Sequence, residues 1–118
     1  MKELPAFLTV EQVLEIHERV TREFGGDPTV RDYGLLESAV AMPAAHFGGE
    51  LLHPNIPAMA AAYLFHICRN HAFADGNKRT ALTATEMFLL LNDWRLNATS
   101  RDLERFTIGV ADGTIGKD

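Results

Sequence analysis

The chain has 118 residues, with 11 Lys and Arg against 16 Asp and Glu, which gives a formal net charge of −5 at pH 7. This length suits one folded domain of about 100–200 residues, and a hydrophobic content of 47% excludes a disordered chain. The acidic balance argues against a general nucleic-acid-binding protein, which carries a basic face. The single cysteine, Cys68, excludes a disulfide-rich secreted scaffold, because it has no partner for an internal disulfide.

No segment has the properties of a membrane span or a signal peptide. The longest apolar run, Ile56 to Phe65, is about half of the roughly 20 residues that cross a bilayer. The segment Met1 to Thr9 lacks the apolar core and small-residue cleavage site of a signal peptide. We therefore expect a single cytoplasmic domain over residues 1–118 that does not bind a membrane.

Helical periodicity dominates the first half of the chain, and strand signals are scarce. Thr9 followed by Gln12 predicts a capping box, and an amphipathic helix then continues to Gly25–Gly26, where the glycines end it. Its predicted apolar face carries Val10, Val13, Leu14, His17, Val20 and Phe24. A second, shorter helix is expected from about Asp32 to before Pro43, with Leu35, Leu36, Ala39 and Val40 on its apolar side.

Two longer apolar helices are expected to form the centre of the domain. Asn55 is a good N-cap for the first of them, which is apolar nearly all round, as centrally placed helices are. Its predicted buried stripe is Ile56, Ala60, Tyr63, Leu64, Ile67 and Cys68. The second is expected from about Asn77 to Leu91, and a further helix capped by Ser100 would carry Leu103, Phe106 and Val110. These elements predict a compact all-α domain.

The loop between the two central helices, from His71 into Asn77, carries most of the polar chemistry. A helix N-terminus leaves several N–H groups unpaired and has about half a positive charge. Gly76 permits close approach of a ligand, and Lys78 and Arg79 add two cations. Such cations disfavour the helix itself by up to about 1 kcal/mol each, unless an anion binds there. The pattern therefore predicts a polyphosphate-binding site.

Two further residues of this loop suggest a reaction. Asp75 offers a hard oxygen ligand, and Mg²⁺ is usually bound by one or two carboxylates together with substrate phosphates. His71, with an ordinary pKa of about 6.5, can take a proton from an attacking hydroxyl at neutral pH. Together they indicate phosphoryl or nucleotidyl transfer. Phe73 is expected to anchor the loop in the core, and His17 to be a hydrogen-bonded core histidine.

The pattern His71-x-Phe73-x-Asp75-Gly76-Asn77-Lys78-Arg79 resembles the signature loop of the Fic/Doc (Fido) superfamily. The Fic branch reads H-P-F-x-[D/E]-G-N-G-R. Lys78, where Fic enzymes carry Gly, matches the death-on-curing (Doc) branch, whereas Gly76 resembles the Fic branch. The flanking helices resemble the family as well, so that the similarity extends over nearly the whole chain. The resemblance implies a Fido-type helical bundle.

The resemblance also implies functional roles. By position, His71 would be the general base and Asp75 the Mg²⁺ ligand. The phosphates of ATP would be held by Gly76, Asn77, Lys78 and Arg79. Fic proteins transfer AMP to a protein hydroxyl. The Doc toxin instead phosphorylates a threonine of elongation factor Tu, which blocks translation, and it is inhibited by an antitoxin.

Three functions therefore remain open at this stage. The first is a Doc-like toxin of a type II toxin-antitoxin system, which transfers the γ-phosphate of ATP to a Thr or Ser of a translation factor such as elongation factor Tu. The second is a Fic-type enzyme that transfers AMP to a protein hydroxyl. The third is an inactive Fido domain that only binds an antitoxin. Direct nucleic-acid binding is not expected.

Overall fold

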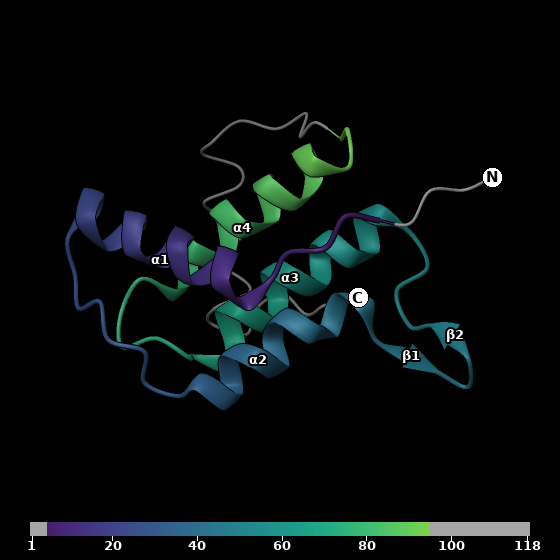
Figure 1. The fold of residues 1–118 in the computed structure, drawn as a ribbon, viewed down its shortest axis with the longest axis horizontal. Helices are drawn as coiled ribbons and strands as arrows, with labels where there is room; N and C mark the ends of the chain where they lie inside the picture. The colour runs from purple at the N-terminus through teal and green to yellow at the C-terminus, as the bar shows by residue number, and fades with distance from the viewer. Residues whose placement is uncertain (1–4, 95–118) are drawn as a thin grey trace.

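The computed structural model describes residues 5–94, and the fold of this range is helical (Figure 1). Its elements in chain order are α1 (Val10–Phe24), α2 (Tyr33–Ala41), a 3₁₀ turn (Met42–Ala44), β1 (His46–Phe47), β2 (Glu50–Leu51), α3 (Ile56–Asn70) and α4 (Asn77–Leu91). The expected all-α fold is confirmed. The helix predicted after Ser100 lies outside the described residues. None of the described helices is long and apolar enough to span a bilayer.

Helices α1 and α3 begin at the predicted capping residues, and α2 begins next to Asp32, where its start was expected. Thr9 Oγ1 accepts a hydrogen bond from the N–H of Gln12 at 3.1 Å, and Gln12 Oε1 accepts one from the N–H of Thr9 at 2.8 Å, which confirms the capping box. Asp32 and Asn55 cap α2 and α3, each with a side-chain oxygen that accepts the N–H three residues further along. These caps satisfy N–H groups that have no partner inside the helix.

Helix α3 lies at the centre, with α4 on one side and α2 on the other, and α1 packs against α4 (Figure 1). The predicted stripe of α3 is buried, except that Ile56 is only partly buried at the edge of the core. The largest fully buried side chains come from all four helices, from the 3₁₀ turn and from the loop before α4: Tyr63, Phe73, Phe88, Leu36, Met59, Val13, Thr80, Pro43 and Cys68. The two central apolar helices are thus confirmed.

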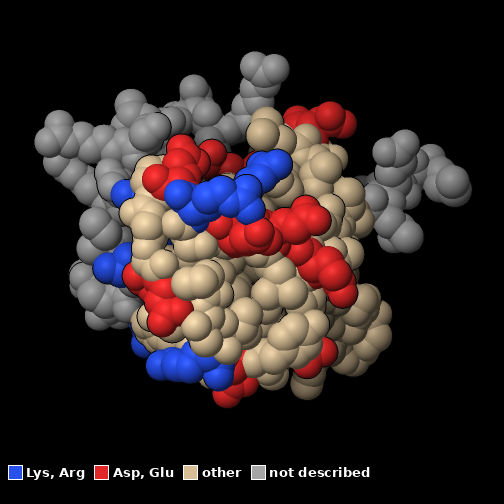
Figure 2. All heavy atoms as spheres, turned by 60° about the vertical axis from the view of Figure 1, so that its left-hand side comes forward, with Lys and Arg blue, Asp and Glu red and all other residues tan. Residues whose placement is uncertain are grey.

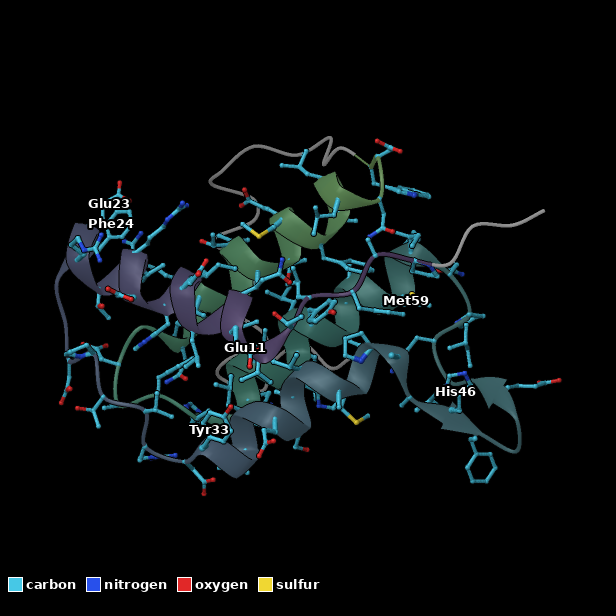
Figure 3. The ribbon with its side chains drawn as sticks, viewed as in Figure 1. Glu11, Glu23, Phe24, Tyr33, His46 and Met59 are labelled. Carbon is cyan, nitrogen blue, oxygen red and sulfur yellow. The ribbon has the colours of Figure 1, made fainter. Side chains whose placement is uncertain are left out.

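Two details differ from the sequence-based expectation. A small antiparallel hairpin, β1–β2, replaces part of the expected loop after α2, and Gly48 and Gly49 form its turn with φ of 60° and 84°. Strands of two residues are too short to show an alternating pattern. Phe24 and Leu35, assigned to apolar faces, are 54% and 37% exposed, because each lies at a helix end beyond the core. Figure 3 shows Phe24 at the outer end of α1.

The core contains two groups whose pKa is raised by burial. Burial raises the pKa of Tyr63 to about 12 from an ordinary 10.0, although its hydroxyl oxygen accepts a 2.8 Å hydrogen bond from the N–H of Leu8. Burial likewise raises the pKa of the Cys68 thiol to about 11 from 9.0. Both groups therefore ionise more readily in the unfolded chain than in the folded protein.

We expect the free energy of unfolding to fall as the pH rises from about 9 to about 12, because the unfolded state then releases protons that the folded state retains. Each pKa unit corresponds to about 1.4 kcal/mol. The Tyr63→Phe variant should be less stable at neutral pH by about 1–3 kcal/mol, since the N–H of Leu8 loses its acceptor. It should also lose less stability at alkaline pH. Urea unfolding of both proteins from pH 7 to 11 measures this, and equal pH slopes would contradict the role of Tyr63.

Candidate functional site

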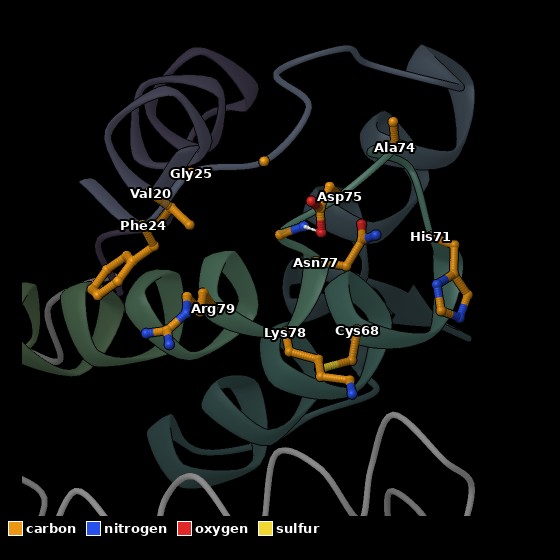
Figure 4. Close-up of a pocket in the computed structure, with 12 residues that line it drawn as sticks. Val20, Phe24, Gly25, Cys68, His71, Ala74, Asp75, Asn77, Lys78 and Arg79 are labelled. Atoms are coloured by element: carbon orange, nitrogen blue, oxygen red, sulfur yellow. Dashed lines mark hydrogen bonds between the residues drawn. The ribbon is translucent and has the colours of Figure 1, made fainter. Parts of the chain in front are cut away.

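The loop between α3 and α4, residues 71–76, is called here the site loop, and it borders a cavity of about 540 Å³ (Figure 4). The end of α1 and the start of α4 form the other walls. All six residues predicted for the site line this cavity. The full lining is Val20, Phe24, Gly25, Gly26, Cys68, His71, Ala74, Asp75, Gly76, Asn77, Lys78 and Arg79. The structure thus brings the predicted residues together around one space.

His71 ends α3 in the left-handed conformation, with φ 50° and ψ 46°. This conformation costs a residue other than glycine about 1–2 kcal/mol. The side chain is exposed, and its ring lies at the opposite end of the cavity from Phe24 (Figure 4). Arg31 holds the backbone here, since its Nη2 donates to the carbonyl oxygen of His71 at 2.6 Å. Strained backbone of this kind occurs preferentially at functional sites.

The segment before α2 pairs with the site loop along its backbone. The N–H groups of Arg31 and Asp32 both donate to the carbonyl oxygen of Ala72, at 2.8 and 3.0 Å. The N–H of Ala74 donates to the carbonyl oxygen of Thr29 at 3.0 Å. These bonds hold the loop against the segment that precedes α2. The sequence analysis did not identify this role for residues 29–32, because the contacts join segments about 40 residues apart.

Phe73 and His17 are buried side chains that anchor the site loop to the core. Phe73 is 1% exposed, which confirms its predicted role as an anchor, and its ring stacks on that of His17 at 3.7 Å between centroids. His17 is buried, and its Nε2 donates a 2.8 Å hydrogen bond to the carbonyl oxygen of Asp75. The prediction of a hydrogen-bonded core histidine is confirmed. That its partner would be the site loop was not predicted.

The Asp75 carboxylate lies between the start of α4 and the turn after α1 (Figure 4). Its Oδ1 accepts a 2.8 Å hydrogen bond from the N–H of Gly76. Its Oδ2 lies so close to Gly26 that a Cβ there would be 2.6 Å away. Residues 5–94 contain no group of three side chains that could hold a metal ion. One accessible carboxylate fits a Mg²⁺ ion that is shared with nucleotide phosphates, which is the usual arrangement for this ion.

Gly76, whose φ of 78° suits glycine, is the N-cap of α4, and no side chain caps the helix. Its first backbone bond runs from the N–H of Thr80 to the carbonyl oxygen of Gly76, so the preceding N–H groups of Asn77, Lys78 and Arg79 have no partner among the described residues. The side chain of Asn77 is used within the loop, where it accepts from the N–H of Phe73 and donates to its carbonyl oxygen. Unpaired N–H groups at a helix N-terminus can bind an anion.

The two cations of the site are held differently. The Arg79 guanidinium lies over the Phe24 ring, 3.9 Å from its centroid, whereas Lys78 extends beside Cys68 (Figure 4). Burial raises the pKa of the Cys68 thiol, and the charge of Lys78 offsets this only in part. The thiol is therefore protonated at neutral pH, which agrees with its predicted role as a small buried apolar group.

Among residues 5–94, the charges on the face shown in Figure 2 do not form a broad basic surface. On the face turned forward in Figure 2, acidic and basic side chains are interspersed rather than separated by sign. Lys78 and Arg79 therefore provide positive charge at the cavity itself. Two cations beside unpaired N–H groups of a helix N-terminus suit a compact polyanion.

Comparison with known proteins agrees with the geometry of the site. The model of the Fic/DOC family matches residues 7–89. The chain is 49% identical over 82 residues to the protein called Toxin Doc of Mycolicibacterium smegmatis. The aligned residues make up 70% of this chain and 62% of that protein. It is 31% identical over 108 residues to Protein kinase doc of Escherichia phage P1. This alignment covers 92% of this chain and 84% of that protein. The chain belongs to the Fic/DOC family.

Proposed function

We propose that this protein is a Doc-type toxin that transfers the γ-phosphate of ATP to a Thr or Ser hydroxyl of a translation factor such as elongation factor Tu. The observation that carries the proposal is one cavity that combines His71, Asp75 and the free N–H groups at the start of α4. Two relatives are named as a toxin and as a protein kinase, which supports the same activity. A cytoplasmic location and restraint by a cognate antitoxin are part of the proposal.

In the proposed reaction, the target hydroxyl gives its proton to His71 while its oxygen attacks the γ-phosphorus of ATP. A new O–P bond forms, the bond to the β-phosphate oxygen breaks, and ADP leaves. The N–H groups of Asn77, Lys78 and Arg79 donate to the phosphates. Asp75 would hold Mg²⁺ together with these phosphates, and the ion would supply positive charge against the charge on the leaving group.

Lys78 is proposed to determine which phosphate reaches the attacking oxygen. Its side chain occupies space along Cys68 that a glycine would leave open to a diphosphate. With that space filled, the nucleotide would enter in reverse and present its γ-phosphate. The Lys78→Gly variant should lose about tenfold or more of its γ-phosphate transfer, which corresponds to about 1.4 kcal/mol, and it could gain nucleotidyl transfer. Lys78→Arg, which keeps the charge, is the control. Unchanged γ-transfer in Lys78→Gly would remove Lys78 from the mechanism.

One observation favours a second function, AMP transfer to a protein hydroxyl. Gly76 lines the cavity at the start of α4, and its φ of 78° is one that glycine adopts without strain. The resemblance of this position to the Fic branch agrees with such a role. In that case the α-phosphorus, and not the γ-phosphorus, would be attacked, and pyrophosphate would leave.

Transfer to purified elongation factor Tu from ATP labelled at either the γ- or the α-phosphate tests both functions. Mg²⁺ is present, and the His71→Ala variant is the control. Label from the γ-position only, lost in the variant, supports the Doc-type kinase. Label from the α-position supports AMP transfer. The absence of label on elongation factor Tu and on any protein of a whole-cell lysate would overturn both and favour an inactive domain that only binds an antitoxin.

A further inference from the structure

A chain of two hydrogen bonds joins His17 to the Asp75 carboxylate through one peptide group. The Nε2 of His17 donates to the carbonyl oxygen of Asp75 at 2.8 Å, and the N–H of Gly76 in the same peptide group donates to Asp75 Oδ1 at 2.8 Å. His17, a residue of α1, therefore fixes the orientation of the 75–76 peptide group through its carbonyl oxygen. The N–H on its other side then fixes the direction of the carboxylate.

We propose that His17 is a positioning residue for the Asp75 carboxylate and acts through the 75–76 peptide. The inference rests on the proposed function, in which Asp75 binds Mg²⁺ together with the nucleotide. His17 lies under the site loop and is 2% exposed, so it reaches neither metal nor substrate. Its effect on metal binding is indirect, through the orientation of its partner.

The geometry requires a donor at this position. A carbonyl oxygen only accepts hydrogen bonds, so that Nε2 of His17 must carry a proton. The stacked ring of Phe73, tilted by 8° from that of His17, restricts the ring orientation. The bond polarises the peptide group and strengthens the bond that its N–H makes to the carboxylate.

Two variants of His17 distinguish a role in positioning the Asp75 carboxylate from a role in core packing alone. His17→Phe keeps the aromatic stacking and the volume but removes the donor, whereas His17→Gln keeps an N–H donor at similar reach and loses the ring. Val13→Ala, at a fully buried position one turn earlier in the same helix, is the control for loss of stability. All are made in the full chain and compared at equal folded fraction.

The first measurement is calorimetric binding of a non-hydrolysable ATP analogue at increasing Mg²⁺. We expect His17→Phe to weaken the apparent Mg²⁺ affinity by about tenfold or more, as loss of a group that orients a metal ligand does. His17→Gln should restore most of it. The second measurement is the amide proton shift of Gly76 in two-dimensional NMR spectra without nucleotide, which should move upfield in His17→Phe as the bond to the carboxylate weakens.

Wild-type Mg²⁺ affinity in His17→Phe would overturn the inference, and so would an equal loss in Val13→Ala. If the wild type binds no magnesium–nucleotide complex, the proposed function fails. The Gly76 shift then decides the role of His17 by itself: an unchanged shift in His17→Phe overturns it, and an upfield movement reversed in His17→Gln supports it.

Discussion

Replacing His71 with Asn is expected to lower phosphate transfer by about 10²–10⁴-fold, because the general base is lost. The same substitution should leave the fold as stable as the wild type, or more stable. His71 adopts a left-handed backbone with φ 50°, and Asn tolerates this region better than most other residues. Activity and stability are therefore expected to change in opposite directions.

Urea unfolding and the labelled-ATP assay test this expectation together. The free energy of unfolding of His71→Asn should equal that of the wild type or exceed it by up to about 1 kcal/mol. His71→Ala is the matched control, because it also loses the base but keeps the unfavourable backbone, so its stability should not rise. Transfer at the wild-type rate in a folded His71→Asn protein would contradict the assignment of the base.

The expected result has a general physical reason. His71 has a backbone conformation that is unfavourable for the residue by itself. It is held there by the hydrogen bond from Arg31 to its carbonyl oxygen and by the pairing of residues 29–32 with the site loop. The surrounding structure offsets the cost of the left-handed residue. A residue that lowers stability in this way is commonly retained for function, and replacing it commonly stabilises the protein.

The helices of the described range could be predicted because their signals are local. The capping box at Thr9, the caps at Asp32 and Asn55 and the glycines after α1 all act within a few residues of the helix ends that they define. The motif also identified six of the residues that line the cavity, because all six lie within the nine positions from His71 to Arg79. Their catalytic and binding roles stay predictions.

The support of the site could not be predicted, because it depends on contacts between distant segments. His17 lies 58 residues from Asp75, and Arg31 lies 40 residues from His71, and no sequence period connects either pair. For the same reason, Gly25–Gly26 was recognised only as the end of a helix. Sequence reasoning also assigned Asn77 to phosphate binding, whereas the structure shows its side chain bonded to the backbone of the site loop.

Replacing Gly26 with Ala is expected to reduce transfer by about 10–100-fold, because the new methyl group displaces the proposed metal ligand. A Cβ at Gly26 would lie 2.6 Å from Asp75 Oδ2 and 3.2 Å from its Cγ. The carboxylate can avoid this contact only by turning, which breaks its bond to the N–H of Gly76. The loss should appear mainly as a higher Mg²⁺ requirement.

Gly25→Ala separates this effect from backbone strain. Both glycines have positive φ, 83° at Gly25 and 117° at Gly26, so either substitution should cost about 1–3 kcal/mol of stability. A Cβ at Gly25, however, would meet nothing within 4 Å. Transfer rates measured against Mg²⁺ concentration, at a temperature where both variants remain folded, should therefore differ between them. Equal rates would show that Asp75 tolerates a turned carboxylate, and the metal would then have to be held mainly by the phosphates of the nucleotide.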